Sequence, residues 1–160
     1  LWITILFCSV LPVFLIHNLC LGLPESKRIF MGDAGSMLIG LVIAWLLVNL
    51  SQGENRAFRP VTTLWLFAMP LIEMVTAVLR RLTSGKSPFK PDLDHSHHLL
   101  IRLGVGEKSA LLILILFSLL MAVIGILGEL YGVAESVMFV GFLLIFGIHF
   151  FSHRIAFRYL

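Results

Sequence analysis

Three of four consecutive residues are histidines, which we call the histidine motif: His95, His97 and His98. If this segment is helical, His95 and His98 share one face. Imidazoles arranged in this way can bind zinc or donate hydrogen bonds to phosphate oxygens. Zinc is disfavoured, because a structural zinc site needs about four ligands and both cysteines lie far away in the sequence. A solvated loop at a membrane surface, without chemistry, is the alternative.

A second candidate for chemistry is Asp33, which lies between Gly32 and Gly35. The glycines allow a sharp turn or the close approach of a ligand. A carboxylate oxygen is the kind of ligand that Mg²⁺ prefers, with water and substrate phosphate completing its shell. The alternative is that Asp33 and Ser36 cap the helix that follows and complement the positive end of its dipole. The local residues leave both interpretations open.

Three charged residues lie in or at the end of one apolar run. Arg80 and Arg81 end this run, where paired arginines commonly anchor a helix at the membrane surface. The planar guanidinium of Arg81 could instead hold an anionic substrate. Glu73 lies inside the run, and an acid within a membrane suggests either a function or a partner on a neighbouring helix. For the single histidines His17 and His149 a structural role is the simpler interpretation.

The elements that must position these residues are long apolar runs. Hydrophobic residues make up 59% of the chain and charged residues 13%, whereas soluble domains have about a quarter charged. Because only helices satisfy their own backbone in hydrocarbon, we predict an all-α fold, a multi-pass transmembrane helix bundle. Pro70 predicts a kink in the third span. About five membrane spans are expected, near residues 1–17, 36–51, 61–79, 109–128 and 133–151.

The basic residues predict which connections share a side of the membrane. Ten of the twelve Lys and Arg lie in the connections 18–35 and 80–108 and the tail 152–160, whereas Arg56 and Arg59 lie elsewhere. The positive-inside rule therefore predicts that loops 18–35 and 80–108 are cytoplasmic. Although the net charge is +3, clustering of the basic residues at the ends of apolar runs argues against nucleic-acid binding.

The start of the chain and its glycine spacing allow three further predictions. Residue Leu1 lies inside an apolar run with no Met or basic segment ahead of it, so we expect no cleaved signal and a missing upstream portion. The sequence contains no internal repeat or linker, which predicts a single membrane domain over residues 1–160. The spacing of Gly128 and Gly132 matches a helix-packing pattern, but its place at a helix end predicts a cap or turn.

Three segments of the chain are similar to those of a known family. They are FMGDAGSMLIG at residues 30–40, SPFKPDLDHSHHLLIRLG at residues 87–104, and RPVTTLWLFAMPLIEMV between them. They resemble the polyprenyl-phosphate N-acetylhexosamine-1-phosphate transferase family (glycosyltransferase family 4), most closely its WecA-type branch. The likeness covers the C-terminal half of such an enzyme. It implies transfer of N-acetylglucosamine 1-phosphate from UDP-N-acetylglucosamine to undecaprenyl phosphate, with release of UMP. That reaction is the first membrane step of a cell-surface polysaccharide pathway, in the bacterial cytoplasmic (inner) membrane.

The resemblance also implies roles for particular residues. Asp33 resembles the catalytic aspartate that binds Mg²⁺, with Mn²⁺ as an alternative ion, and Phe30 resembles the aromatic residue that stacks on uracil. Asn18 resembles the asparagine that precedes the Gly-Asp motif, although the spacing is longer here. Arg81 resembles a substrate-binding arginine, and the histidine motif resembles the one near the diphosphate and sugar. Glu73 stands where the family more often has aspartate.

The partners that the resemblance implies are a UDP-sugar, a polyprenyl phosphate lipid and the membrane, with a homodimer left open. The family's paired aspartates, expected upstream, are absent from these 160 residues, so the chain alone is predicted to be inactive. Phospho-N-acetylmuramoyl-pentapeptide transferase is an alternative; Ser96 counts against it, because that enzyme has three consecutive histidines. A non-catalytic membrane scaffold is the alternative from another class.

Overall fold

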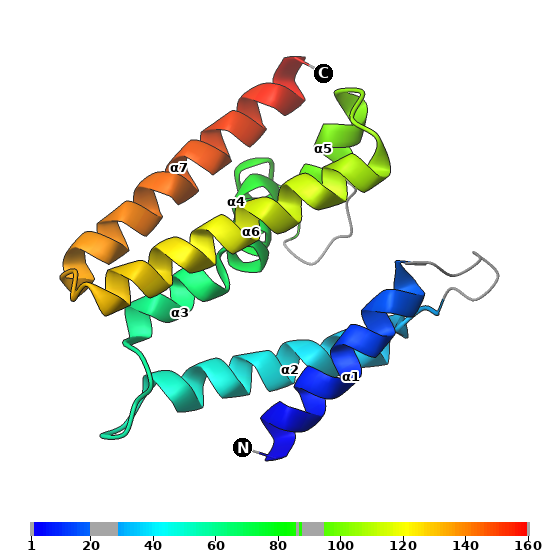
Figure 1. The fold of residues 1–160 in the computed structure, drawn as a ribbon. Coiled ribbons are helices and arrows are strands. Elements are labelled where there is room, and N and C mark those ends of the chain that lie inside the picture. Colours follow the sequence, from blue (N-terminus) through cyan, green and yellow to red (C-terminus); the bar gives the residue numbers. More distant parts are fainter. Residues whose placement is uncertain (1, 20–28, 86, 88–94, 160) are drawn as a thin grey trace. The chain divides into compact units, whose positions relative to one another are not determined.

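The computed structural model describes residues 2–19, 29–85, 87 and 95–159 (Figure 1). The described residues form seven helices and no strand, which confirms the all-α prediction. The chain divides into two units, Leu1–Leu46 and Leu47–Leu160. The prediction of a single membrane domain stays a prediction.

The first unit contains α1 (Trp2–Asn18) and most of α2 (Gly32–Ser51). Both helices are apolar on every side, which is typical of helices that contact hydrocarbon. Apolar side chains of α1, Met31 and the first turns of α2 line a shared cavity of about 330 Å³. The helix α2 begins four residues before the expected start of the second span, so Gly32 and Asp33 belong to its first turn.

The second unit contains five helices. These are α3 (Pro60–Leu66), α4 (Ala68–Thr83), α5 (Ser96–Arg102), α6 (Glu107–Leu130) and α7 (Glu135–Tyr159). The helices α3 and α4 pack against both long helices, α6 and α7, and α5 packs against the same two (Figure 1). Each of the three shorter helices therefore bridges the two long ones.

The number of membrane spans is close to the predicted five. Among the described residues, α2, α6 and α7 are long and apolar enough to cross a membrane, and the pair α3 and α4 makes a fourth if it is counted as one broken span. The helix α1, with 17 residues, is shorter than these. The chain is an integral membrane protein, and the outer faces of α6 and α7 carry the exposed side chains that hydrocarbon requires: Leu112, Leu116, Leu119, Leu120, Val140, Leu144 and Ile148.

The third expected span is two helices, not one kinked helix. The helices α3 and α4 meet at an angle of 82°, and the break lies at Phe67, which has φ −110° and ψ 25°. Pro70 lies in the first turn of α4, where its missing N–H needs no partner within the helix. The prediction of a bend was correct, but the proline marks the start of the second helix and the bend lies three residues earlier.

Trp65 is at the centre of the core of the second unit. A Cβ atom on Gly125 of α6 would lie 2.4 Å from the Cβ of Trp65, so only glycine allows α3 to lie this close to α6. The rings of Trp65 and Phe142 meet edge to face, with centroids 5.9 Å apart. The remaining buried side chains of this core come from α3, α4, α6 and α7: Val61, Ala68, Ile72, Met121 and Met138.

The connection between α6 and α7 is a turn built on Gly132. This glycine has φ +64°, in the left-handed region. Its N–H donates to the carbonyl of Glu129 (3.1 Å), and the N–H of Val133 donates to the carbonyl of Gly128 (2.9 Å). This pair of hydrogen bonds is the Schellman arrangement that ends many helices. The prediction of a cap at Gly128–Gly132 is confirmed.

Candidate functional site

Asp33 lies in the first turn of α2 and is exposed. Gly32, directly before it, has φ +68° and turns the chain into the helix. The hydroxyl of Ser36 donates to the backbone carbonyl of Asp33 at 2.9 Å, one turn inside the helix. Ser36 is therefore not the N-cap residue, and that part of the capping alternative is wrong. The carboxylate of Asp33 lies at the positive end of the helix dipole, where an anionic group is stabilised.

Two more predicted site residues lie at the same end of this unit. Asn18 is the last residue of α1, and its side-chain amide donates to the carbonyl of Ile29 at 3.0 Å. This hydrogen bond ties the end of α1 to the segment that leads into α2. Phe30 follows Ile29 and is 75% exposed. The structure therefore brings Asn18, Phe30 and Asp33 to one end of the first unit.

One exposed carboxylate is enough to take part in a Mg²⁺ site. Magnesium in proteins is commonly held by one or two carboxylates, with water and substrate phosphate as the other ligands. Asp33 supplies one hard oxygen, and the space where a side chain of Gly32 would be is open, with no atom within 4 Å. Within the described ranges, no group of three or more His, Cys, Asp or Glu residues is placed to hold a metal ion. Asp33 therefore fits as one ligand of an ion that is shared with a phosphate substrate.

The histidine motif is held by Glu73, which lies in α4 in the second unit. The carboxylate of Glu73 accepts a hydrogen bond from the N–H of Ser96 at 3.3 Å and another from its hydroxyl. The Nδ1 atom of His95 lies 3.3 Å from the same carboxylate, and the Nε2 atom of His149 lies 3.5 Å away. We call these four residues the Glu73 junction. It joins α4, the start of α5 and the middle of α7.

The Glu73 junction explains why an acid is tolerated in an apolar run. The N–H of Ser96 is the first of the four at the start of α5 that have no partner within the helix. Glu73 supplies that partner from another helix, and negative charge is favourable there. The alternative that Glu73 pairs with neighbouring helices is confirmed, and the structural role expected for His149 is its contact with Glu73. When one apolar run contains a carboxyl group and another contains a histidine, the sequence indicates that the two side chains pair within the membrane protein.

The imidazoles of the histidine motif lie in a row. The helix α5 begins at Ser96, so His95 is its N-cap residue and lies just outside it. The ring of His97 is stacked parallel to that of His95, with the ring centroids 6.0 Å apart, and the centroids of His97 and His98 are 3.9 Å apart. The expected shared face of His95 and His98 is therefore replaced by a row with His97 in the middle. Such a row presents several ring nitrogens to one ligand.

The charge of His97 depends on what lies beside it. Burial lowers the pKa of His97 from its usual value of 6.5, and the neighbouring rings of His98 and His95 lower it further, while Glu73 opposes them. A phosphate group beside the row would favour the protonated ring and raise this pKa again. An anionic ligand would therefore bring a proton with it at a pH between the lowered pKa and the usual one.

Arg81 lies in the last turn of α4, beside Arg80. It lies eight positions after Glu73, which corresponds to about 12 Å along the helix axis. Both arginines are at the negative end of the helix dipole, where a cation is favourable. Arg81 and the histidine motif belong to the unit Leu47–Leu160, whereas Asn18, Phe30 and Asp33 belong to Leu1–Leu46. The predicted residues thus form two groups, one in each unit.

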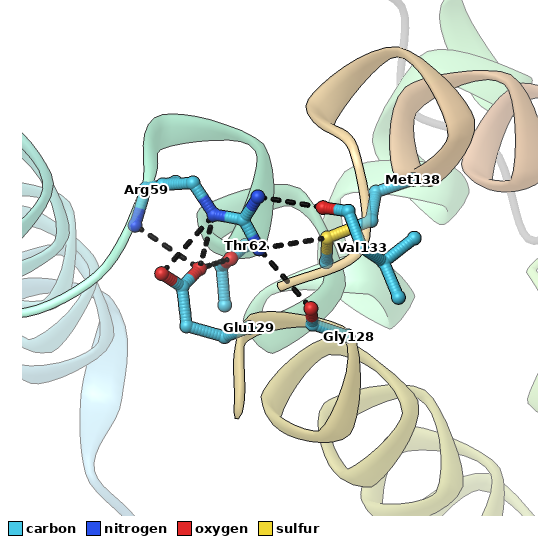
Figure 2. Close-up of polar contacts among 6 residues, drawn as sticks. All are labelled: Arg59, Thr62, Gly128, Glu129, Val133 and Met138. Carbon is cyan, nitrogen blue, oxygen red and sulfur yellow. Dashed lines mark hydrogen bonds and ion pairs between the residues drawn. The ribbon is translucent and has the colours of Figure 1, made fainter. Parts of the chain in front are cut away.

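A further polar cluster, which the sequence pattern does not predict, surrounds Arg59 (Figure 2). The Nε atom of Arg59 donates to both carboxylate oxygens of Glu129 at 3.1 Å. Its Nη1 donates to the carbonyl of Val133 at 2.6 Å, and its Nη2 to the carbonyl of Gly128 at 3.1 Å. The hydroxyl of Thr62 also donates to Glu129. Arg59 is therefore a structural cation that ties the start of α3 to the end of α6.

Replacing Arg59 by alanine is expected to lower the free energy of unfolding by about 2–4 kcal/mol, because it removes the cation that is paired with Glu129 and the guanidinium donors to the carbonyls of Gly128 and Val133. The midpoint of thermal or detergent-induced unfolding measures this effect. Arg56→Ala is the matched control, since Arg56 is exposed, and we expect it to change the midpoint little. Equal midpoints for the two variants would show that the cluster contributes nothing.

The sequence of this chain is similar to those of known proteins. Residues 1–51, which include Asn18, Phe30 and Asp33, match the model of glycosyl transferase family 4. The chain is 45% identical over 157 residues to the undecaprenyl-phosphate alpha-N-acetylglucosaminyl 1-phosphate transferase of Haemophilus influenzae, an alignment that covers 98% of this chain and 44% of the relative. The chain is therefore similar to glycosyl transferase family 4 over residues 1–51, and to a transferase over nearly its whole length.

Two other relatives carry the same name. The protein of Pasteurella multocida is 43% identical over 159 residues, covering 98% of this chain and 44% of the relative. The protein of Escherichia coli K12 is 42% identical over 146 residues, covering 91% of this chain and 39% of the relative. The chain thus spans less than half the length of these curated relatives. No solved structure matches it.

Proposed function

We propose that the protein containing this chain transfers N-acetylglucosamine 1-phosphate from UDP-N-acetylglucosamine to undecaprenyl phosphate and releases UMP. The observation that carries this proposal is the 42–45% identity, over 91–98% of the chain, to three transferases of that name. In this reaction a phosphate oxygen of the lipid attacks the phosphorus that bears the sugar. A new P–O–P bond forms, and the bond between the two phosphates of the donor breaks as UMP leaves. The reaction opens a cell-surface polysaccharide pathway.

Each group of residues has a part in this proposal. Asp33 would hold Mg²⁺, or Mn²⁺ in its place, and such an ion would neutralise charge on the diphosphate. The exposed ring of Phe30 stacks on the uracil. Asn18 positions the segment that carries Phe30 through its hydrogen bond to Ile29. These residues bind and orient the nucleotide half of the donor.

The second group binds the other half of the donor. Arg81 and the histidine motif supply donors to the diphosphate and the sugar, and the row of three neighbouring imidazole rings supports this role. Phosphoryl transfer depends mostly on positioning and on charge neutralisation. The Glu73 junction serves this need by fixing the start of α5, so the histidine motif is held before the substrate arrives.

The proposed location is the bacterial inner membrane, with loops 18–35 and 80–108 in the cytoplasm. The bias of Lys and Arg towards these loops supports this orientation. One of the two exceptions, Arg59, has a structural role at the end of α6, so its presence on the other side does not weaken the rule. We further infer that the 160 residues alone do not catalyse the reaction, because they span 44% of the length of a relative such as that of Haemophilus influenzae.

A donor competition assay tests the proposal. The whole protein, purified and supplied with undecaprenyl phosphate and Mg²⁺, is expected to release UMP from UDP-N-acetylglucosamine. The muramoyl-pentapeptide donor, in excess, is expected to leave this rate unchanged. Preference for the pentapeptide donor would assign the protein to the related transferase instead. Absence of UMP release from either donor, with the protein folded, would favour the non-catalytic scaffold.

A further inference from the structure

A polar pocket lies where α4 and α7 pack together, apart from the histidine motif. Its volume is about 130 Å³, which equals about four water molecules of liquid volume. Two arginines line it, Arg80 from the last turn of α4 and Arg154 from α7. The other polar groups are a histidine and three hydroxyls: His153, Thr76, Thr83 and Ser84. We call this cavity the arginine pocket.

The lining of the arginine pocket is suited to an anion. Neither aspartate nor glutamate is among its described lining residues. Guanidinium groups donate paired hydrogen bonds that match phosphate oxygens, and hydroxyls can add further donors. Two guanidinium groups that line one cavity give it a positive potential, which favours a bound anion. The charge and the donor set therefore both select a phosphate group.

Thr76 gives an independent indication of a ligand. Its side chain is 4% exposed, and its hydroxyl has no hydrogen-bond partner among the described residues. A buried hydroxyl without a partner is unfavourable, so native structures rarely keep one unless water or a ligand completes it. Because Thr76 lines the arginine pocket, a phosphate oxygen bound there could accept its hydrogen bond.

The position of the arginine pocket points to the membrane surface. Arg80 lies in the last turn of α4, and Arg154 lies five residues before the end of α7 at Tyr159. Phe150, one turn before Arg154, adds an aromatic wall to the pocket. Basic pockets between membrane helices are a recurrent site for anionic lipid head groups. We propose that the arginine pocket binds a phosphate group, supplied by the head group of an anionic phospholipid or by soluble phosphate.

This site does not depend on the proposed transferase function. It uses Arg80 and Arg154, whereas the proposed substrate contacts are Arg81 and the histidine motif. The two sites are neighbours through two histidines. The ring centroid of His153, in the arginine pocket, lies 5.8 Å from that of His149, a member of the Glu73 junction. Lipid binding and turnover can therefore be measured separately, and either can fail without the other.

The test measures lipid retention by the whole protein in nanodiscs. Wild-type protein is expected to bind phosphatidylglycerol in preference to phosphatidylcholine, as measured by native mass spectrometry. The double variant Arg80→Gln/Arg154→Gln is expected to weaken this binding by about thirtyfold, because each basic residue near an anionic lipid contributes about a factor of five. The control is Arg56→Gln, which removes an exposed arginine outside the pocket and should leave the binding unchanged.

Two further measurements keep the test decisive. Thr76→Val replaces the hydroxyl with a methyl group of similar size, so we expect an equal or higher unfolding midpoint in phosphatidylcholine together with weaker phosphatidylglycerol binding. Inorganic phosphate is titrated into phosphatidylcholine nanodiscs as the second source. If it raises the unfolding midpoint of wild type but not of the double variant, the site takes soluble phosphate. If neither phosphate nor phosphatidylglycerol distinguishes wild type from the double variant, the arginine pocket binds no phosphate and the proposal is wrong.

Discussion

The variant Asp33→Asn of the whole protein is expected to lose at least about 100-fold in kcat while it folds normally, which is the usual size of effect when one preorganised charge contact to a transition state is removed. The amide keeps the shape of the carboxylate but not its charge, so it is a poor ligand for Mg²⁺. Folding should be affected little, because Asp33 is exposed in the first turn of α2. Loss of its favourable interaction with the helix dipole costs only about 0.3–1 kcal/mol.

The measurements that accompany Asp33→Asn separate a metal ligand from a helix cap. UMP release is followed across a range of Mg²⁺ concentrations, and a higher Mg²⁺ requirement is expected for any residual activity. The control Glu54→Gln neutralises an exposed carboxylate in the connection between α2 and α3, and it should keep wild-type turnover. If Asp33→Asn also kept wild-type turnover and the wild-type Mg²⁺ requirement, Asp33 would be a capping residue only.

Replacing Glu73 by alanine is expected to lower kcat/KM by about 10–100-fold, the range seen when a residue that orients direct ligands is removed. The change leaves the N–H and hydroxyl of Ser96 without an acceptor and releases His95 and His149. Stability should fall by about 1–3 kcal/mol, because these donors stay buried without a partner. Glu73→Gln keeps the shape and one acceptor oxygen, so part of both losses should be recovered.

A comparison on the same helix distinguishes positioning from general damage to α4. Met74 is adjacent to Glu73 and 57% exposed, so Met74→Ala tests the effect of a truncation that leaves the Glu73 junction intact. We expect Met74→Ala to keep kcat/KM, and Glu73→Ala to raise KM for the UDP-sugar, since the histidine motif is then no longer held in place. A normal KM and kcat in Glu73→Ala would show that α5 is positioned by other contacts.

The helices were predictable from the sequence because the apolar runs are long and the membrane leaves few alternatives. The break at Phe67 was not, because Pro70 is the visible signal and it lies in the first turn after the bend. The apolar run predicts that the second span starts at residue 36, whereas α2 begins at Gly32. Gly32 and Asp33 are not apolar, so the apolar pattern assigns them to a loop. The pattern of apolar and polar residues therefore predicts which helices exist but not the residues at which they begin and end.

The candidate site was predictable where its residues are close in sequence. Asp33 and the histidine motif stand out by residue type, and their segments resemble a known family. The contacts of Glu73 with Ser96 and His149 join residues 23 and 76 positions apart, and Arg59 reaches Glu129 across 70. No local pattern encodes such pairs, because packing of whole helices determines them.

The sharp bend between α3 and α4 changes the depth at which the charges of α4 lie. If α3 runs along the membrane normal, α4 at 82° to it runs almost parallel to the bilayer plane. Its 16 residues then change depth by only about 3 Å, although they extend for about 24 Å. Glu73, Arg80 and Arg81 would lie at nearly one level. The acid that seems to be in the middle of a span in the sequence would then be level with the arginines, within reach of water and of lipid head groups.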